Sequence, residues 1–293
     1  QAAGDAAAQD VLADFDSLKS SFEAQDIEFF MINPLGLKDR DAVKAELTAR
    51  HIDVPVLMDD ARLISEALGI DKIGEVLVYN PKSFTVMFRG PVGEELTTAL
   101  TDIAAGRDVQ TIEVASTGTA VNYPIRMAHQ QQAPSYEKEI GPIIAENCAS
   151  CHRAGGIAPF ALDSHTMVMG WSQMIREVLM TKRMPPGQID PQIGHFINDM
   201  VLADADAQKI VHWIEAGSPK DGGSDPLAEL VWPETEWAFG EPDYIIDIPE
   251  QSIPATGVLD YYNVMVELDL EEDRWVRASQ YIPGDHRIAP YPA

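Results

Sequence analysis

The chain has 293 residues, 45% of them hydrophobic and 23% charged, a composition typical of a folded globular protein of about two domains. Its 47 acidic and 21 basic side chains give a net charge of −26. Because nucleic acids and anionic membranes repel such a chain, nonspecific binding to either is excluded as its main activity. The charge fits a partner with a basic face, or equally a saline habitat. No apolar run is long enough to predict a transmembrane segment.

The first third of the chain alternates between helical and strand patterns. Apolar spacing predicts helices over 5–24, 39–51, 60–69 and 93–105, and strands over 27–33, 55–59, 74–81 and 84–91. The turn-forming sequence NPKS at 80–83 predicts a hairpin between the last two strands. This order of elements indicates an α/β sandwich that occupies residues 1–110.

The same order resembles a thioredoxin-like domain over residues 5–107. In that family the catalytic cysteines precede the first long helix, and a cis-proline faces them at the start of a later strand. Here no cysteine precedes the first helix, and the expected Thr-Pro position reads Ile73-Gly74. Because thiol–disulfide exchange needs a thiolate, the domain is predicted to serve docking or scaffolding rather than redox catalysis. Residues 111–134, rich in Thr, Ala and Gln, are predicted to be a partly extended linker.

The chain has only two cysteines, Cys148 and Cys151, and His152 follows directly. C-x-x-C-H is the attachment signal of c-type haem. Cysteines three residues apart on one helical turn project to the same side, where each can form a thioether with a haem vinyl group while the histidine coordinates the iron. The alternatives are a thiol redox pair or half of a zinc site. A redox pair opens a helix whereas this pair ends one, and no second cysteine pair exists to complete a zinc site. One covalent haem c is therefore predicted.

A c-type haem takes a second axial ligand, most often a methionine sulfur. The predicted helix at 171–190 stops at Met184, and two prolines after it stiffen the backbone. Met184 is therefore the predicted sixth ligand, with His195 as the alternative. Other candidates are Met167, Met169, Met174, Met180 and Met200. The helical spacing of Met174 and Met180 indicates core filling instead.

The last predicted helix covers residues 203–219 and carries Trp213, which is expected to pack against Ile140 and Ile144 of the helix before the cysteines. His212, beside the tryptophan, is expected to be structural. Residues 135–222 resemble an all-α class I cytochrome c domain that reads CASCHRAGGIAPFAL, RMPP, GHFIND and VHWIEAGSP. The resemblance implies haem-binding roles for Cys148, Cys151, His152 and Met184.

The final segment, 223–293, is acidic, and alternation in YYNVMVELDL and RWVRASQYI predicts a short β-rich tail. It holds 15 acidic and three basic side chains, a net of −12. The order of parts resembles fusion proteins that join a redoxin-like domain, a cytochrome c domain and a β-sandwich like that of copper type II, ascorbate-dependent monooxygenases. Copper sites in such sandwiches use clustered histidines, and the tail offers only His286.

Two classes of function remain open. The first is an exported, periplasmic electron-transfer cytochrome with one haem c and a redox protein partner, its signal peptide removed before Gln1. The second is the electron-delivering part of a copper- or thiol-dependent enzyme whose second centre lies outside this chain. The first is favoured, and with it a protein that is not an enzyme, because the sequence contains no second redox centre. A subunit of a larger redox complex is a third interpretation.

Overall fold

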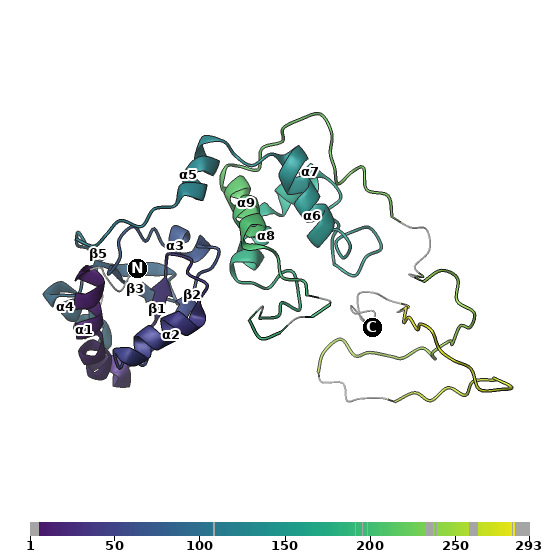
Figure 1. Ribbon diagram of the computed structural model, residues 1–293, viewed down its shortest axis with the longest axis horizontal. Coiled ribbons are helices and arrows are strands. Elements are labelled where there is room, and N and C mark those ends of the chain that lie inside the picture. The colour runs from purple at the N-terminus through teal and green to yellow at the C-terminus, as the bar shows by residue number, and fades with distance from the viewer. Residues whose placement is uncertain are drawn as a thin grey trace.

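The computed structural model describes residues 6–107, 109–190, 192–194, 196, 197, 199–232, 237, 239–257, 263–282 and 284. Its helices and strands are α1 (Ala6–Phe22), the 3₁₀ turn η2 (Glu23–Gln25), β1 (Met31–Asn33), α2 (Arg40–Ala49), β2 (Val56–Met58), α3 (Leu63–Ala67), β3 (Val76–Asn80), β4 (Thr85–Gly90), α4 (Glu94–Ala104), β5 (Ile112–Glu113), α5 (Pro124–Gln131), the π-helix η3 (Tyr136–Ile140), α6 (Gly141–Asn147), α7 (His165–Gly170), α8 (Ser172–Met180) and α9 (Asp204–Glu215). An α/β part (α1 to β5) precedes a helical part (η3 to α9), and α5 lies between them (Figure 1). None of the described helices is long and apolar enough to cross a membrane.

Local side-chain chemistry explains where several elements begin and turn. The Asp39 carboxylate accepts the N–H of Ala42 at 2.9 Å and caps the start of α2. In the predicted hairpin, the Asn80 side chain accepts the N–H of Lys82 at 2.9 Å, which turns the chain from β3 into antiparallel β4. The predicted helices and strands of the first 107 residues are all present, and the strand predicted at 27–33 shortens to β1.

The strands form two small sheets. One pairs β1 with β2 in parallel, and the other has the order β3-β4-β5, in which β5 runs parallel to β4. On this second sheet, Leu18 and Phe22 of α1 and Leu96 and Leu100 of α4 bury the ring of Phe88. The prediction of mixed α/β content is therefore confirmed for this part, which consists of small sheets covered by helices.

The linker predicted at 111–134 contains regular structure, which corrects that prediction. Ile112 pairs with Phe88 and packs against the same apolar core. Further on, the N–H of Ile73 donates to the Thr119 carbonyl at 2.9 Å, and Val121 is buried against Ile73. These apolar residues are too few and too widely spaced to produce a periodic pattern, so their burial depends on partners distant in sequence.

The helical part has one core, in which the predicted packing is confirmed. The side chain of Trp213 in α9 is fully buried together with Ile140 and Ile144. The Tyr136 ring stacks on Trp213 with centroids 5.9 Å apart. Gly217 follows the end of α9 with φ +89°, the left-handed backbone that ends helices and favours glycine. Burial of this aromatic cluster is the main stabilising interaction between the helix before the cysteines and the last helix.

The core extends past the predicted boundary at residue 222. Leu227 is buried in it, and the Asp225 carboxylate accepts the Tyr136 hydroxyl at 2.5 Å and the His165 N–H at 2.9 Å. Although burial acts to raise it, these hydrogen bonds lower the pKa of Asp225.

We expect Tyr136→Phe to lower the free energy of unfolding by about 1.5–3 kcal/mol, because it removes a hydrogen bond to a charged group in a buried site. Urea denaturation followed by circular dichroism measures the change. Tyr79→Phe is the matched control, since Tyr79 is half exposed on β3, and its expected effect is below about 0.5 kcal/mol. Equal effects of the two variants would show that the Tyr136–Asp225 hydrogen bond is not important for stability.

In the described residues of the C-terminal segment, the predicted strands are not formed. The described residues of 239–257 and 263–282 belong to no strand, and Figure 1 draws them as a long irregular segment. Almost all of their side chains are exposed, Met265 and Trp275 among them. Alternation predicts which face of a strand is apolar, but a strand forms only when a neighbour satisfies its backbone groups.

Candidate functional site

The CASCH segment forms one tight turn directly after α6. The N–H of Cys148 donates to the Ile144 carbonyl at 2.9 Å and continues the helical hydrogen bonds. The N–H groups of Cys151 and His152 both donate to the Cys148 carbonyl, at 3.2 and 2.9 Å. The sequence-predicted cysteines and histidine therefore share one turn, as their spacing implies.

The loop after the turn folds back onto it. The N–H of Ala158 donates to the Cys151 carbonyl at 3.1 Å, and the N–H of Leu162 donates to the His152 carbonyl at 2.8 Å. This close approach requires glycine at position 156, because a Cβ there would lie 2.4 Å from the Cys151 carbonyl oxygen. Gly156 thus allows the loop of residues 153–162 to fold closely onto the turn.

The His152 ring is held by one hydrogen bond and one aromatic contact. Its Nδ1 lies 3.1 Å from the backbone carbonyl oxygen of Phe160, and the two rings lie 4.7 Å apart. Because a carbonyl can only accept, Nδ1 carries the hydrogen and Nε2 keeps its lone pair. Burial lowers the pKa of His152, which favours this neutral form. Phe160 is itself fixed by stacking on Trp171 at 4.1 Å.

Both cysteines are free thiols. Burial, and secondarily the neighbouring Cys151, raise the pKa of the Cys148 thiol to about 12. A reactive redox pair instead relies on a thiol whose pKa is lowered by a helix N-terminus or a cation. The surroundings of Cys148, at the end of a helix and against the apolar core, favour an uncharged thiol and oppose the reading as a thiol-exchange centre.

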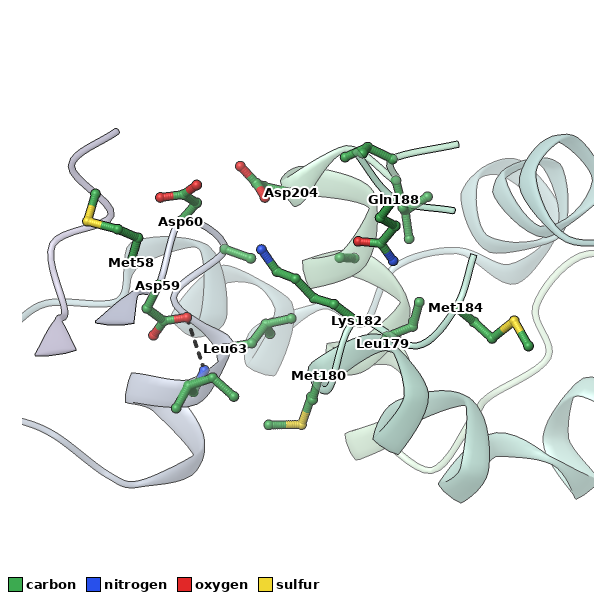
Figure 2. A pocket seen from close by; sticks show the side chains of 15 residues that line it. Met58, Asp59, Asp60, Leu63, Leu179, Met180, Lys182, Met184, Gln188 and Asp204 are labelled. Carbon is green, nitrogen blue, oxygen red and sulfur yellow. Dashed lines mark hydrogen bonds between the residues drawn. The ribbon is translucent and has the colours of Figure 1, made fainter. Parts of the chain in front are cut away.

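Met184 lies elsewhere, in the segment that follows α8. It lines a hollow of about 100 Å³ between the two parts of the molecule, together with Met180 and Lys182 from the helical part and Asp60 from the α/β part. Figure 2 shows its thioether directed away from Asp60, and its side chain is 40% exposed. The residues that line this hollow do not include Cys148, Cys151 or His152. The structure therefore brings three of the four predicted haem-binding residues together in one turn, and Met184 lies outside that turn, in the segment after α8.

Of the alternative haem ligands, His195 lies outside the described residues. His286, the only histidine of the tail, lies outside them too. The prediction that Met174 fills the core is wrong, because its side chain is 46% exposed, whereas Met180 is partly buried in the hollow. Met169 and Met200 are also exposed, and Met167 is half-buried.

Sequence reasoning missed a cluster around His212, which it treated as a structural residue on a helix face. His212 is buried, and its two ring nitrogens lie within hydrogen-bonding distance of Glu66 and His129. The three residues come from α9, α3 and α5, separated by more than sixty positions, so no local spacing could reveal them.

Among the described residues, no group of three or more histidine, cysteine, aspartate or glutamate side chains could by itself hold a metal ion. No protein-family model, curated protein or solved structure matches the chain.

Proposed function

We propose that the chain is a c-type cytochrome that transfers single electrons through one covalently bound haem c. Cys148 and Cys151 would hold the group through thioethers, and His152 Nε2 and Met184 Sδ would ligate its iron. Such a group, when bound, supplies a one-electron change between Fe(II) and Fe(III). The porphyrin provides the other four iron ligands, so this site needs no cluster of protein ligands of the kind that a bare metal ion requires.

The proposal rests mainly on the hydrogen bond between His152 Nδ1 and the backbone carbonyl of Phe160. A histidine that ligates a metal usually donates its other N–H to a carbonyl or carboxylate, which fixes the tautomer and the ring orientation. Here the Phe160 carbonyl fixes the hydrogen on Nδ1, 3.1 Å away, and leaves Nε2 available. The same turn contains two free thiols, which are the groups that thioether formation consumes.

The α/β part has a supporting role in this proposal. It contains no cysteine, and it contacts the segment that follows α8, where Arg40 pairs with Asp190 and the Gln192 side chain donates to the Lys38 carbonyl at 2.8 Å. We infer a docking or scaffolding function in an exported, periplasmic protein. The exposed acidic C-terminal segment fits a redox partner with a basic face, either free or within a larger complex.

The test is covalent haem attachment. The chain, produced together with a c-type haem attachment system, is expected to keep haem on a denaturing gel and to develop a c-type α band on reduction. Changing Cys148 and Cys151 together to Ser is expected to abolish the gel-bound haem entirely, because a hydroxyl forms no thioether.

Ser150→Ala is the matched control, since Ser150 lies between the two cysteines and its exposed hydroxyl can be removed without changing their spacing. It is expected to keep full haem content. A wild-type chain without the α band, or a double serine variant that retains denaturation-resistant haem, contradicts the proposal.

A further inference from the structure

Three ionisable side chains form a continuous hydrogen-bonded chain between the two parts of the molecule. The Glu66 carboxylate on α3 lies 2.7 Å from Nε2 of His212 on α9. Nδ1 of His212 lies 2.8 Å from Nδ1 of His129 on α5. The side chains of Glu66 and His212 are almost completely buried, at 2% and 3% exposed. We call these three residues the histidine latch.

The number of hydrogens in the latch follows from its donors and acceptors. The Glu66 carboxylate accepts, so Nε2 of His212 carries a hydrogen, and in the neutral ring Nδ1 is then an acceptor. His129 therefore donates from its own Nδ1. If both rings become cations, each Nδ1 carries a hydrogen, and two N–H groups face each other 2.8 Å apart. The latch thus accommodates at most one additional proton.

Other charged side chains lie near the latch on the elements packed against it. They are Arg126 on α5, Glu139 on η3, Arg176 on α8, and Lys209 and Glu215 on α9. Arg126 links Glu66, at 3.2 Å, to Glu215, at 3.1 Å, and Arg176 holds Glu215 at 2.8 Å. The carboxylates of Glu66 and Glu215 are thus already matched by arginines, and a doubly charged histidine pair would add unmatched positive charge.

His129 is the most exposed residue of the latch. It is partly exposed and, together with the buried His212, lines a hollow of about 240 Å³ whose other lining residues include Arg126 and Glu215. Burial, and then the neighbouring His212 ring, lower the pKa of His129 from its usual 6.5. A form in which His129 is solvated binds its proton more readily, so this form gains population as the pH falls below 6.5. The closed latch is thus favoured above this pH.

Other contacts across the same junction are also polar. The Gln208 side chain on α9 donates to the Ala61 carbonyl at 2.7 Å, and Lys38 pairs with Asp204 at the start of α9. Polar contacts hold two parts of a chain together less firmly than a large apolar interface does. A change in protonation at one buried pair can therefore shift the equilibrium between the closed and open arrangements of the two parts.

We propose that the histidine latch is a proton-sensitive contact that holds the α/β part against α5 and α9 while at most one proton is added, and that it opens in acid. The proposal is independent of haem binding, because no latch residue belongs to the CASCH turn. It adds to the proposed electron carrier a pH-dependent change in how its two parts are held together.

Hydrogen exchange of the full chain, measured by mass spectrometry at pH 7.5 and 5.0 and corrected for intrinsic rates, tests the latch. Between these values we expect peptides from α3, α5 and α9 to lose protection about tenfold, the factor that one pKa unit of coupling represents. Peptides from the β3–β4 hairpin are expected to keep their protection. A wild-type chain without this local loss, or with an equal loss in the hairpin, overturns the proposal.

His129→Gln retains an amide that can donate to or accept from His212 and does not titrate. We expect wild-type protection at pH 7.5 and loss of the pH dependence. His51→Gln, which changes an exposed histidine after α2, is the matched control and is expected to behave as wild type. A His129→Gln chain that keeps the full pH dependence overturns the proposal.

Imidazole ¹⁵N NMR of the wild-type chain gives a reading that does not depend on any variant. At pH 7.5 we expect one hydrogen shared between Nδ1 of His129 and Nδ1 of His212, which lie 2.8 Å apart, seen as a scalar coupling between the two nitrogens. Two Nδ1 resonances without this coupling contradict the shared hydrogen on which the latch depends.

Discussion

Trp213→Ala is expected to lower the free energy of unfolding of the helical part by about 3–5 kcal/mol. The Trp213 side chain is fully buried, and its truncation leaves a cavity in the core that it shares with residues of η3, α6 and α7. It also removes the indole N–H donor to the Pro219 carbonyl, 2.8 Å away. Single domains are usually stable by about 5–15 kcal/mol, so this loss removes a large share of the total.

Urea denaturation measures this change in the free energy of unfolding. It is followed by far-ultraviolet circular dichroism, so that the signal comes from the backbone and not from tryptophan. Trp275→Ala is the matched control, because that side chain is fully exposed and its removal is expected to change stability by less than about 0.5 kcal/mol. Trp213→Phe is expected to fall between the two, since it keeps an aromatic ring and loses the hydrogen bond. A Trp213→Ala chain as stable as the Trp275→Ala chain would contradict the assignment of Trp213 to the centre of this core.

The parts of the fold that the sequence predicts are those determined by neighbours along the chain. Asn80 and Asp39 act within three residues of their own positions, at the hairpin and at the start of α2, and both features were predicted. In α9 the helical spacing of Ile210, Trp213 and Ile214 predicts a buried face, and all three residues are buried. In each case the physical cause of the structure lies within a short stretch of sequence.

The prediction failed where burial depends on distant partners. Ile112 joins a sheet because Phe88 offers it an edge and an apolar neighbour, and nothing within residues 111–134 reveals this. In the C-terminal segment the prediction failed in the opposite way, because it expected regular structure that the described residues do not form. The alternation around Met265 and Trp275 predicts strands, but the described residues there belong to no strand, and most of them are exposed.

The candidate site likewise combines residues that a local motif predicts with contacts that depend on the fold. Cys148, Cys151 and His152 were predicted because a five-residue motif contains all three. The Phe160 carbonyl that fixes the tautomer of His152 could not be predicted, because it depends on the path of the loop that follows. The latch could not be predicted either, because Glu66 and His212 meet only when α3 packs beside α9. A motif can therefore identify the reactive groups, whereas their protonation and orientation require the fold.

Met184 is the part of the proposed site that depends most on the fold, since it lies outside the CASCH turn. It follows α8, and its N–H lies 3.3 Å from the Val178 carbonyl, which ties this segment back to the helix. Its side chain is 40% exposed and its thioether is directed away from the acidic side of the hollow (Figure 2). Met174 is exposed to a similar extent, so exposure alone does not distinguish a ligand from a surface residue; the proposed ligation by Met184 makes a spectral prediction that exposure does not.

Met184→Ala in the haem-loaded chain is therefore expected to convert the spectrum completely from low spin to high spin, and to lower the midpoint potential because thioether ligation favours Fe(II). Absorption spectroscopy with redox titration measures both effects. Stability is expected to change by less than about 0.5 kcal/mol, so unfolding would not explain the spectral change. Met174→Ala is the matched control, because Met174 lies on α8 and is exposed to a similar extent, 46%. Its expected spectrum is that of wild type.

His195→Ala separates the two proposed ligands. If Met184 binds the iron, the His195→Ala spectrum remains low spin and only Met184→Ala changes. A low-spin Met184→Ala chain together with a high-spin His195→Ala chain would instead assign the sixth position to His195. In that case the potential of the wild-type chain is expected to be low, since two imidazole ligands lack the thioether's preference for Fe(II). The spin state and the potential must therefore change together, and a chain in which only one of them responds to Met184→Ala contradicts ligation by this residue.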